Sequence, residues 1–124
     1  MSDISHVMEV EEPWWTLIRS GLKTVEGREN SPKWSSVKVG DTIKIVNKGK
    51  FYYVNVSNIN EYPPSPGHKN PFHPLFDYLL TEGLYNALPG FVTIDEGLKV
   101  YLKWSKWDEI EKYGFRGFHI EVLQ

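Results

Sequence analysis

Two cations and one carboxylate lie close together near the start of the chain, in Lys23, Glu26 and Arg28. With Gly21 they form the pattern G-x-K-x-x-E-x-R. A guanidinium donates in a planar fork to a phosphate or a base edge, and a lysine supplies a movable positive charge. A glutamate accepts from an exocyclic amine or orients a water. If the three converge on a cleft, they predict recognition of a nucleotide-like ligand; the alternative is a solvated ion pair that contributes little.

Aromatic and histidine side chains nearby add to this prediction. Trp34 stands in a polar stretch after the motif and is the first candidate for stacking on a base, the alternative being that it covers one end of the fold. His6 lies on the first expected strand as a candidate donor on the cleft wall. The four histidines show no metal-ligand spacing, and the chain has no glycine-rich phosphate loop. The sequence therefore predicts no metal and no cofactor.

Charge and composition narrow the class of protein. The net charge of −2 excludes general coating of nucleic acid, yet residues 14–60 carry eight Lys and Arg against only Glu26, Glu29 and Asp41. A local basic region remains available for a nucleic acid. The absence of cysteine excludes disulfides, thiolate nucleophiles and Cys-based zinc sites. No leader-like or membrane-spanning apolar stretch is found, so the expected location is the cytoplasm.

The elements that must position these residues follow from periodicity and turn signals. Strands are expected at 5–10, 23–28, 42–46, 51–59 and 115–123, with a turn at 47–50. Helices are expected at 13–20, 75–82 and 93–104, with a helical turn at 108–113; residues 29–38 and the proline-rich segment 62–74 are expected to be loops. Trp14 is expected in the core and Trp15 on the surface.

This order predicts an α+β fold in a single domain over residues 1–124. Its form is a small, partly open barrel of five or six mostly antiparallel strands, with two to three covering helices. A ligand cleft is expected where the helices and loops meet.

Several segments together resemble a known family. Residues 20–28, 37–43, 88–90, 95–101 and 111–114 look like those of the ASCH domain, a branch of the PUA-like superfamily, and the resemblance extends from His6 to Val122. It implies a PUA-like β-barrel with a cleft lined by Lys23, Glu26 and Arg28. It also implies RNA or a modified nucleoside as the ligand. The predicted function is therefore RNA or nucleotide binding in this cleft.

Two alternatives stay open. One branch of the family, the small bacterial acetylcytidine amidohydrolases, implies a lysine base, a threonine nucleophile three residues later and a downstream glutamate acid. Lys23 matches the base, Glu26 stands at the nucleophile position with Thr24 beside the lysine, and the downstream acid falls near Glu82. Lys23, Glu26 and Glu82 are thus the candidate catalytic residues of this alternative. The second alternative is a protein-interaction module whose contact surface is the proline-rich segment 62–74.

Overall fold

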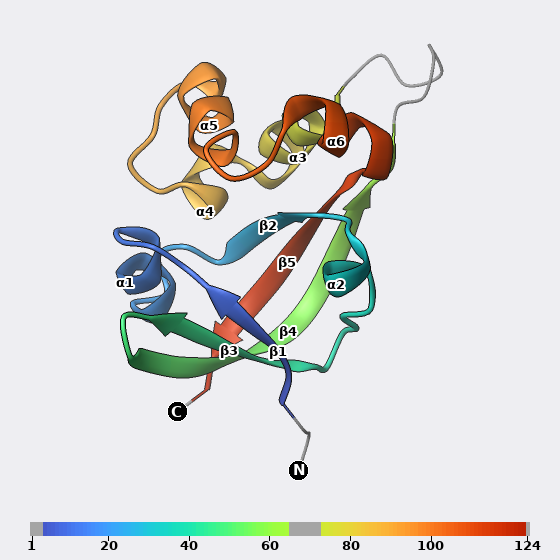
Figure 1. Cartoon of the computed structure of the whole chain (residues 1–124). Helices are drawn as coiled ribbons and strands as arrows, with labels where there is room; N and C mark the ends of the chain where they lie inside the picture. Colours follow the sequence, from blue (N-terminus) through green and yellow to red (C-terminus); the bar gives the residue numbers. More distant parts are fainter. Residues whose placement is uncertain (1–3, 65–72, 124) are drawn as a thin grey trace.

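The computed structural model describes residues 4–64 and 73–123. Its five strands are β1 (Ile4–Glu9), β2 (Val25–Glu29), β3 (Thr42–Asn47), β4 (Lys50–Tyr62) and β5 (Phe115–Val122). Its helices are α1 (Trp14–Arg19), α2 (Pro32–Ser35), α3 (Pro74–Glu82), α4 (Leu84–Ala87), α5 (Ile94–Tyr101) and α6 (Trp107–Tyr113). Figure 1 shows their arrangement.

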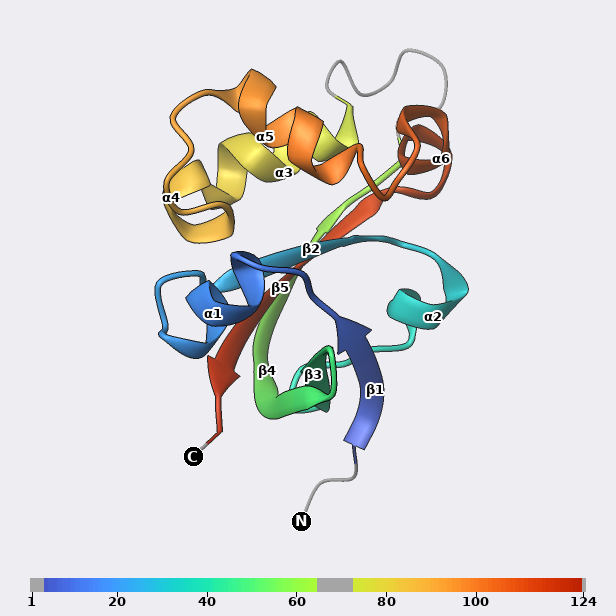
Figure 2. The ribbon, with the colours of Figure 1, turned by 60° about the vertical axis from the view of Figure 1, so that its left-hand side comes forward.

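All five strands form one curled sheet with the order β1-β3-β4-β5-β2. Strand β1 pairs with β3 in parallel, and the other three pairings are antiparallel. The sheet curls into a half-barrel that does not close, so β1 and β2 are its two edges (Figure 2). The predicted α+β fold with a partly open, mostly antiparallel barrel is confirmed.

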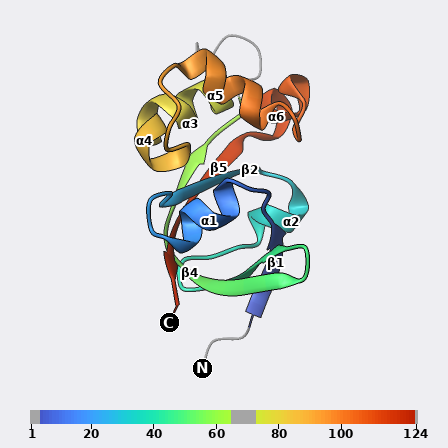
Figure 3. The same cartoon turned by 90° about the vertical axis from the view of Figure 1, so that its left-hand side faces the viewer.

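The helices lie in two groups. Helices α3, α4, α5 and α6 form a layer across one end of the half-barrel, and α1 and α2 lie beside it (Figures 1 and 3). The described residues form six helices rather than two to three, because α2 and α4 are single turns within the expected loop 29–38 and the expected connector after Glu82. A four-residue turn carries too little apolar periodicity to be recognised in a sequence.

The start of helix α5 is set by its capping residues, whereas its apolar pattern did not predict where the helix ends. Thr93 caps α5 through the expected capping box with Glu96, whose backbone N–H it accepts at 3.2 Å. The helix ends at Tyr101 instead of continuing to residue 104.

The expectation that Trp15 is exposed is wrong: its ring lies 4.9 Å from that of Tyr52, whose hydroxyl donates to the Trp15 carbonyl oxygen at 2.6 Å.

A pair of glycines brings the helical layer close to the sheet. Gly27 on β2 lies directly opposite Gly117 on β5. The ring of Tyr78, on α3, occupies the space that side chains at these two positions would fill. The Tyr78 hydroxyl then hydrogen-bonds the Tyr101 hydroxyl at 2.7 Å. The glycine pair therefore sets the position of two buried tyrosines next to β2.

Residues 65–72, most of the proline-rich segment, lie outside the described residues, so the predicted protein contact surface there stays a prediction. Within 4–64 and 73–123, no helix combines the length and the apolar character needed to cross a bilayer.

Candidate functional site

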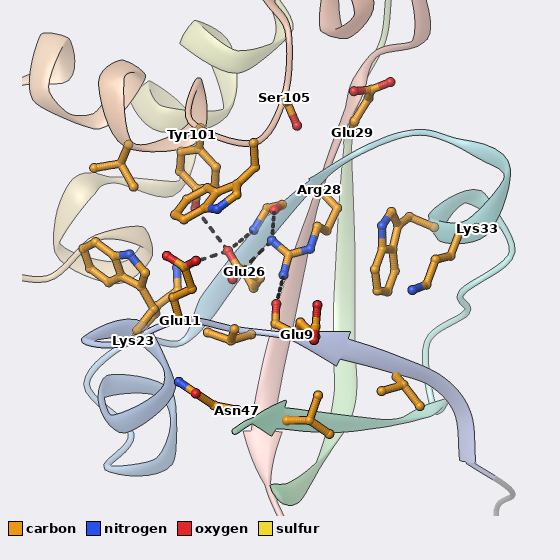
Figure 4. A pocket seen from close by; sticks show the side chains of 18 of the residues that line it. Glu9, Glu11, Lys23, Glu26, Arg28, Glu29, Lys33, Asn47, Tyr101 and Ser105 are labelled. Carbon is orange, nitrogen blue, oxygen red and sulfur yellow. Dashed lines mark hydrogen bonds and ion pairs between the residues drawn. The ribbon is translucent and has the colours of Figure 1, made fainter. Parts of the chain in front are cut away.

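A pocket of about 850 Å³ opens between the two edge strands of the half-barrel (Figure 4). Residues of β1, β2 and α2 line it from the barrel side, and Val100 and Tyr101 of α5 line it from the helical layer. Its volume lies within the range of small-molecule sites. Lys23, Glu26 and Arg28 all line this pocket, so the motif converges on one cleft.

Lys23 lies at the base of the pocket and is only 1 % exposed. Its Nζ donates to the carbonyl oxygen of Val25 at 2.7 Å and also to that of Ala87, from α4. Nζ also lies 3.4 Å from Glu26 Oε1. An ammonium has three N–H donors, so these three oxygens use all of them within the protein. Burial lowers the pKa of Lys23, and the neighbouring Glu26 carboxylate opposes this shift.

Glu26 is the buried acceptor at the centre of the site. Its Oε1 accepts from the backbone N–H of Gly27 at 2.8 Å and from the Tyr101 hydroxyl at 3.3 Å. Its Oε2 lies 3.6 Å from Arg28 Nη1. Oε1 is thus held from several sides, while the contact of Oε2 is an ion pair with Arg28.

The charge of Glu26 follows from opposing effects. Burial raises the pKa of its carboxyl group, but the positive charges of Lys23 and Arg28 and the Gly27 N–H outweigh burial and hold the pKa below its ordinary value of 4.5. Glu26 is therefore an ionised carboxylate at neutral pH and can only accept hydrogen bonds.

This charge gives a prediction for stability against pH. Because the pKa of Glu26 is lower in the folded than in the unfolded chain, its ionisation contributes stability that is present above about pH 4.5 and is lost as the pH falls through the lowered value. The difference in melting temperature between the wild type and Glu26→Gln is expected to stay constant from pH 7 to 5 and to shrink below that. Thermal unfolding from pH 7 to 3 measures it. A difference that already shrinks between pH 7 and 5 would show that the pKa is raised instead.

Arg28 joins the two edges of the half-barrel. Its Nη2 donates to the carbonyl oxygen of Glu9 on β1 at 3.0 Å, and its side chain is 21 % exposed. The indole of Trp34, on α2, lies 5.7 Å from the guanidinium and 4.7 Å from Lys33 Nζ. Trp34 is half-buried, packs 6.2 Å from the Phe118 ring and also lines the pocket. Trp34 therefore packs on the barrel and also lines the pocket, and its stacking on a base stays a prediction.

Three further residues that the sequence analysis considered for the site do not line this pocket. The His6 ring stacks on that of Trp34 with 5.8 Å between ring centroids, and His6 Nε2 lies 3.0 Å from the Ser36 hydroxyl oxygen. Thr24, the threonine next to the motif lysine, is exposed on the surface. Neither of them, nor Glu82, is among the residues that line the pocket.

Glu82 lies in a separate polar cluster on the other face of β5. Its carboxylate accepts hydrogen bonds from the Tyr62 hydroxyl and from Asn60 Nδ2, the latter at 2.8 Å. It also lies 2.8 Å from His119 Nε2. Burial and the Glu82 carboxylate together raise the pKa of Tyr62. The geometric expectation that Glu82 joins Lys23 and Glu26 in one cleft is not met. The alignment that placed Glu82 near the motif crosses a loop whose length differs from that of the family branch, so the sequence did not determine its position.

The sequence did not point to several residues of the pocket. Tyr101 reaches Glu26 from a position 75 residues further along the chain, and Trp14, from α1, lies with its ring 5.7 Å from Lys23 Nζ. Their spacing resembles that of ordinary core positions. Among the described residues, no group of three or more metal-ligating side chains lies together.

An open five-stranded half-barrel, with a helical layer across one end and a charged pocket between its edge strands, defines a PUA-like domain. The chain belongs to the ASCH domain family, whose match covers residues 8–118. The resemblance drawn from the motifs is thereby confirmed.

Solved structures agree with this assignment. The hypothetical protein PH0355 is 31 % identical with a TM-score of 0.81, and the match covers 95 % of this chain and 98 % of that protein. Protein PF0455 from Pyrococcus furiosus is 29 % identical with a TM-score of 0.72, covering 96 % of each chain. The ASCH protein from Zymomonas mobilis is 14 % identical with a TM-score of 0.59, covering 96 % of this chain and 68 % of that one, and shares the fold. No curated protein matches the chain.

Proposed function

We propose that the pocket between β1 and β2 binds RNA or a nucleotide through one of its bases. The observation that carries the proposal is the pair formed by an ionised, acceptor-only Glu26 and a donor-only Arg28 at 3.6 Å in a pocket with an indole wall. A base edge presents donors beside acceptors, so adjacent acceptor and donor groups match it. Domains of the PUA-like class generally bind RNA, which agrees with this chemistry.

The three motif residues take different roles in this proposal. Arg28 has five N–H donors, and two of them hydrogen-bond the backbone oxygens of Glu9 and Gly27, so it retains donors for a ligand. Glu26 accepts through Oε2. Lys23 uses its three donors inside the protein and therefore acts as the positioning residue that keeps Glu26 charged and in place. Trp34 supplies a stacking face, and Arg28 and Lys33 lie over the same indole.

Replacing Arg28 tests this assignment. The protein is titrated with AMP, CMP, GMP and UMP by calorimetry, and at least one nucleotide is expected to bind saturably. Arg28→Ala is expected to weaken that binding about 10-fold to 150-fold, because hydrogen bonds from a charged group contribute about 1.5–3 kcal/mol.

Arg19→Ala is the matched control, since Arg19 is an exposed arginine on α1 that stacks on Trp15 and does not line the pocket. This control is expected to keep the wild-type affinity. If Arg28→Ala, folded as judged by circular dichroism, also binds like the wild type, the assignment of the site is wrong.

The amidohydrolase alternative has one supporting observation, the wholly buried Lys23 beside a carboxylate. Two observations oppose it: the donors of Lys23 are occupied by backbone oxygens and Glu26, and Thr24 does not line the pocket. Incubation with acetylated cytidine separates the two proposals. Release of cytidine that disappears in Glu26→Gln would favour hydrolysis over binding alone.

A further inference from the structure

Trp104 stands at the mouth of the pocket, and among the described residues no other aromatic ring or cation contacts its indole. It follows α5 and lines the pocket together with Ser105. Its side chain is 49 % exposed, which is unusual for the largest apolar side chain. An exposed apolar side chain at the rim of a binding pocket indicates a contact with a ligand or a partner.

The other four tryptophans all have a ring partner. Their closest ring contacts are Trp14 with Phe91, Trp15 with Tyr52, Trp34 with His6 and Trp107 with His73. Within 4–64 and 73–123, Trp104 has neither an aromatic contact nor a cation over its ring. The exposed half of its side chain is thus available to a ligand at the pocket mouth.

The charges around the mouth favour a polymer over a free nucleotide. Four carboxylates, of Glu9, Glu11, Glu26 and Glu29, line the pocket with four cations, of Lys23, Arg28, Lys33 and Lys48, so its lining has no excess of positive charge. A lining without net positive charge gives little added attraction to the terminal phosphate of a nucleotide, which carries a charge of about −1.5 to −2 at pH 7. A phosphodiester carries a single charge at each phosphate, and a chain can lead its phosphates away from the pocket.

Lysines stand where such a chain would leave. Lys103 and Lys106 are exposed on either side of Trp104 and Ser105, and neither lines the pocket itself. Exposed aromatic rings flanked by cations are the usual means of holding single strands, because every base offers a face for stacking.

From these observations we infer that Trp104 stacks on the nucleotide next to the one held in the pocket, so that the ligand is single-stranded RNA. The inference rests on the proposed function and specifies its substrate class. The pocket holds one base between Glu26, Arg28 and Trp34. The neighbouring base lies on Trp104, and its phosphates face Lys103 and Lys106.

Trp104→Ala tests the inference with two probes, the best-binding mononucleotide and an eight-nucleotide single-stranded RNA of mixed sequence. Affinity for the RNA is expected to fall about 5-fold to 150-fold, since stacking of one base on an aromatic side chain contributes about 1–3 kcal/mol. Affinity for the mononucleotide is expected to fall much less than affinity for the RNA, because a mononucleotide has no second base to stack on Trp104 and the pocket keeps Glu26 and Arg28.

Trp107→Ala is the matched control, a tryptophan that is 40 % exposed, stacks on His73 and does not line the pocket. It is expected to bind both probes like the wild type. The inference is overturned if Trp104→Ala binds RNA as tightly as Trp107→Ala, or if it weakens RNA and mononucleotide equally. Failure of the wild type to bind either probe overturns the proposed function itself, which is a distinguishable result.

Discussion

Replacement of Lys23 by methionine is expected to lower the free energy of unfolding by about 3–5 kcal/mol, as breaking a buried ion pair does when one partner stays behind. Methionine keeps most of the apolar stem of Lys23 but provides no charge and no donor. Glu26 would then lose the nearest of its two counter-charges, and the carbonyl oxygens of Val25 and Ala87 would lose their shared donor. Urea or thermal unfolding measures the change.

Two further variants sharpen this test. Lys38→Met, at an exposed lysine, is expected to stay within about 0.5 kcal/mol of the wild type. The double variant Lys23→Met, Glu26→Gln removes both charges and is expected to recover part of the loss. A loss below about 1 kcal/mol for Lys23→Met alone would contradict the view that Lys23 is a structural counter-charge.

Gly27→Ala is expected to destabilise the fold by about 3 kcal/mol, at the upper end of the usual cost of overpacking a core. The added methyl group would lie 2.7 Å from Tyr78 Cζ and in still closer contact with the Phe115 ring. Both rings are buried and pack against Tyr101, so neither can move aside without disturbing the others. The same clash displaces the hydroxyls that lead from Tyr78 through Tyr101 to Glu26, so ligand affinity is expected to fall as well.

Gly97→Ala provides the comparison for this prediction. Gly97 is also buried, but a methyl group there would meet only ends of leucine side chains at 3.0–3.3 Å, and alanine favours the helix by about 1 kcal/mol over glycine. We expect its stability to remain within about 1 kcal/mol of the wild type. Equal stability of the two variants would show that the glycine pair does not set the approach of α3 to the sheet.

Local patterns in the sequence predicted much of the fold because they act over short distances. The turn at 47–50 and the capping box at Thr93 each depend on neighbouring residues, and both appear as expected. The single-turn helices α2 and α4 were missed for the opposite reason, since their geometry depends on packing more than on periodicity. The predicted exposure of Trp15 was wrong because the apolar pattern of so short a helix cannot show that Tyr52, from β4, covers the Trp15 side chain.

The candidate site was predictable in its motif but not in its surroundings. The spacing of Lys23, Glu26 and Arg28 predicted that they lie in one cleft. In the structure β2 begins only at Val25, so Lys23 lies before the strand and its side-chain direction does not follow the alternation of the strand residues. Its burial could not be foreseen, because lysine is almost never fully buried without partners that come from elsewhere in the chain. One of those partners, the Ala87 carbonyl oxygen, comes from the distant helical layer, and so does the Tyr101 hydroxyl that donates to Glu26.

The central claim is that a base lies between Glu26, Arg28 and Trp34. Nuclear magnetic resonance of the nitrogen-labelled protein during titration with the best-binding mononucleotide tests it most directly. We predict saturable shifts of the Trp34 indole N–H and the Arg28 side-chain N–H, with the Trp15 indole and Arg19 unchanged, because the last two lie outside the pocket. Shifts at Trp15 and Arg19 that leave Trp34 and Arg28 unmoved would contradict the account.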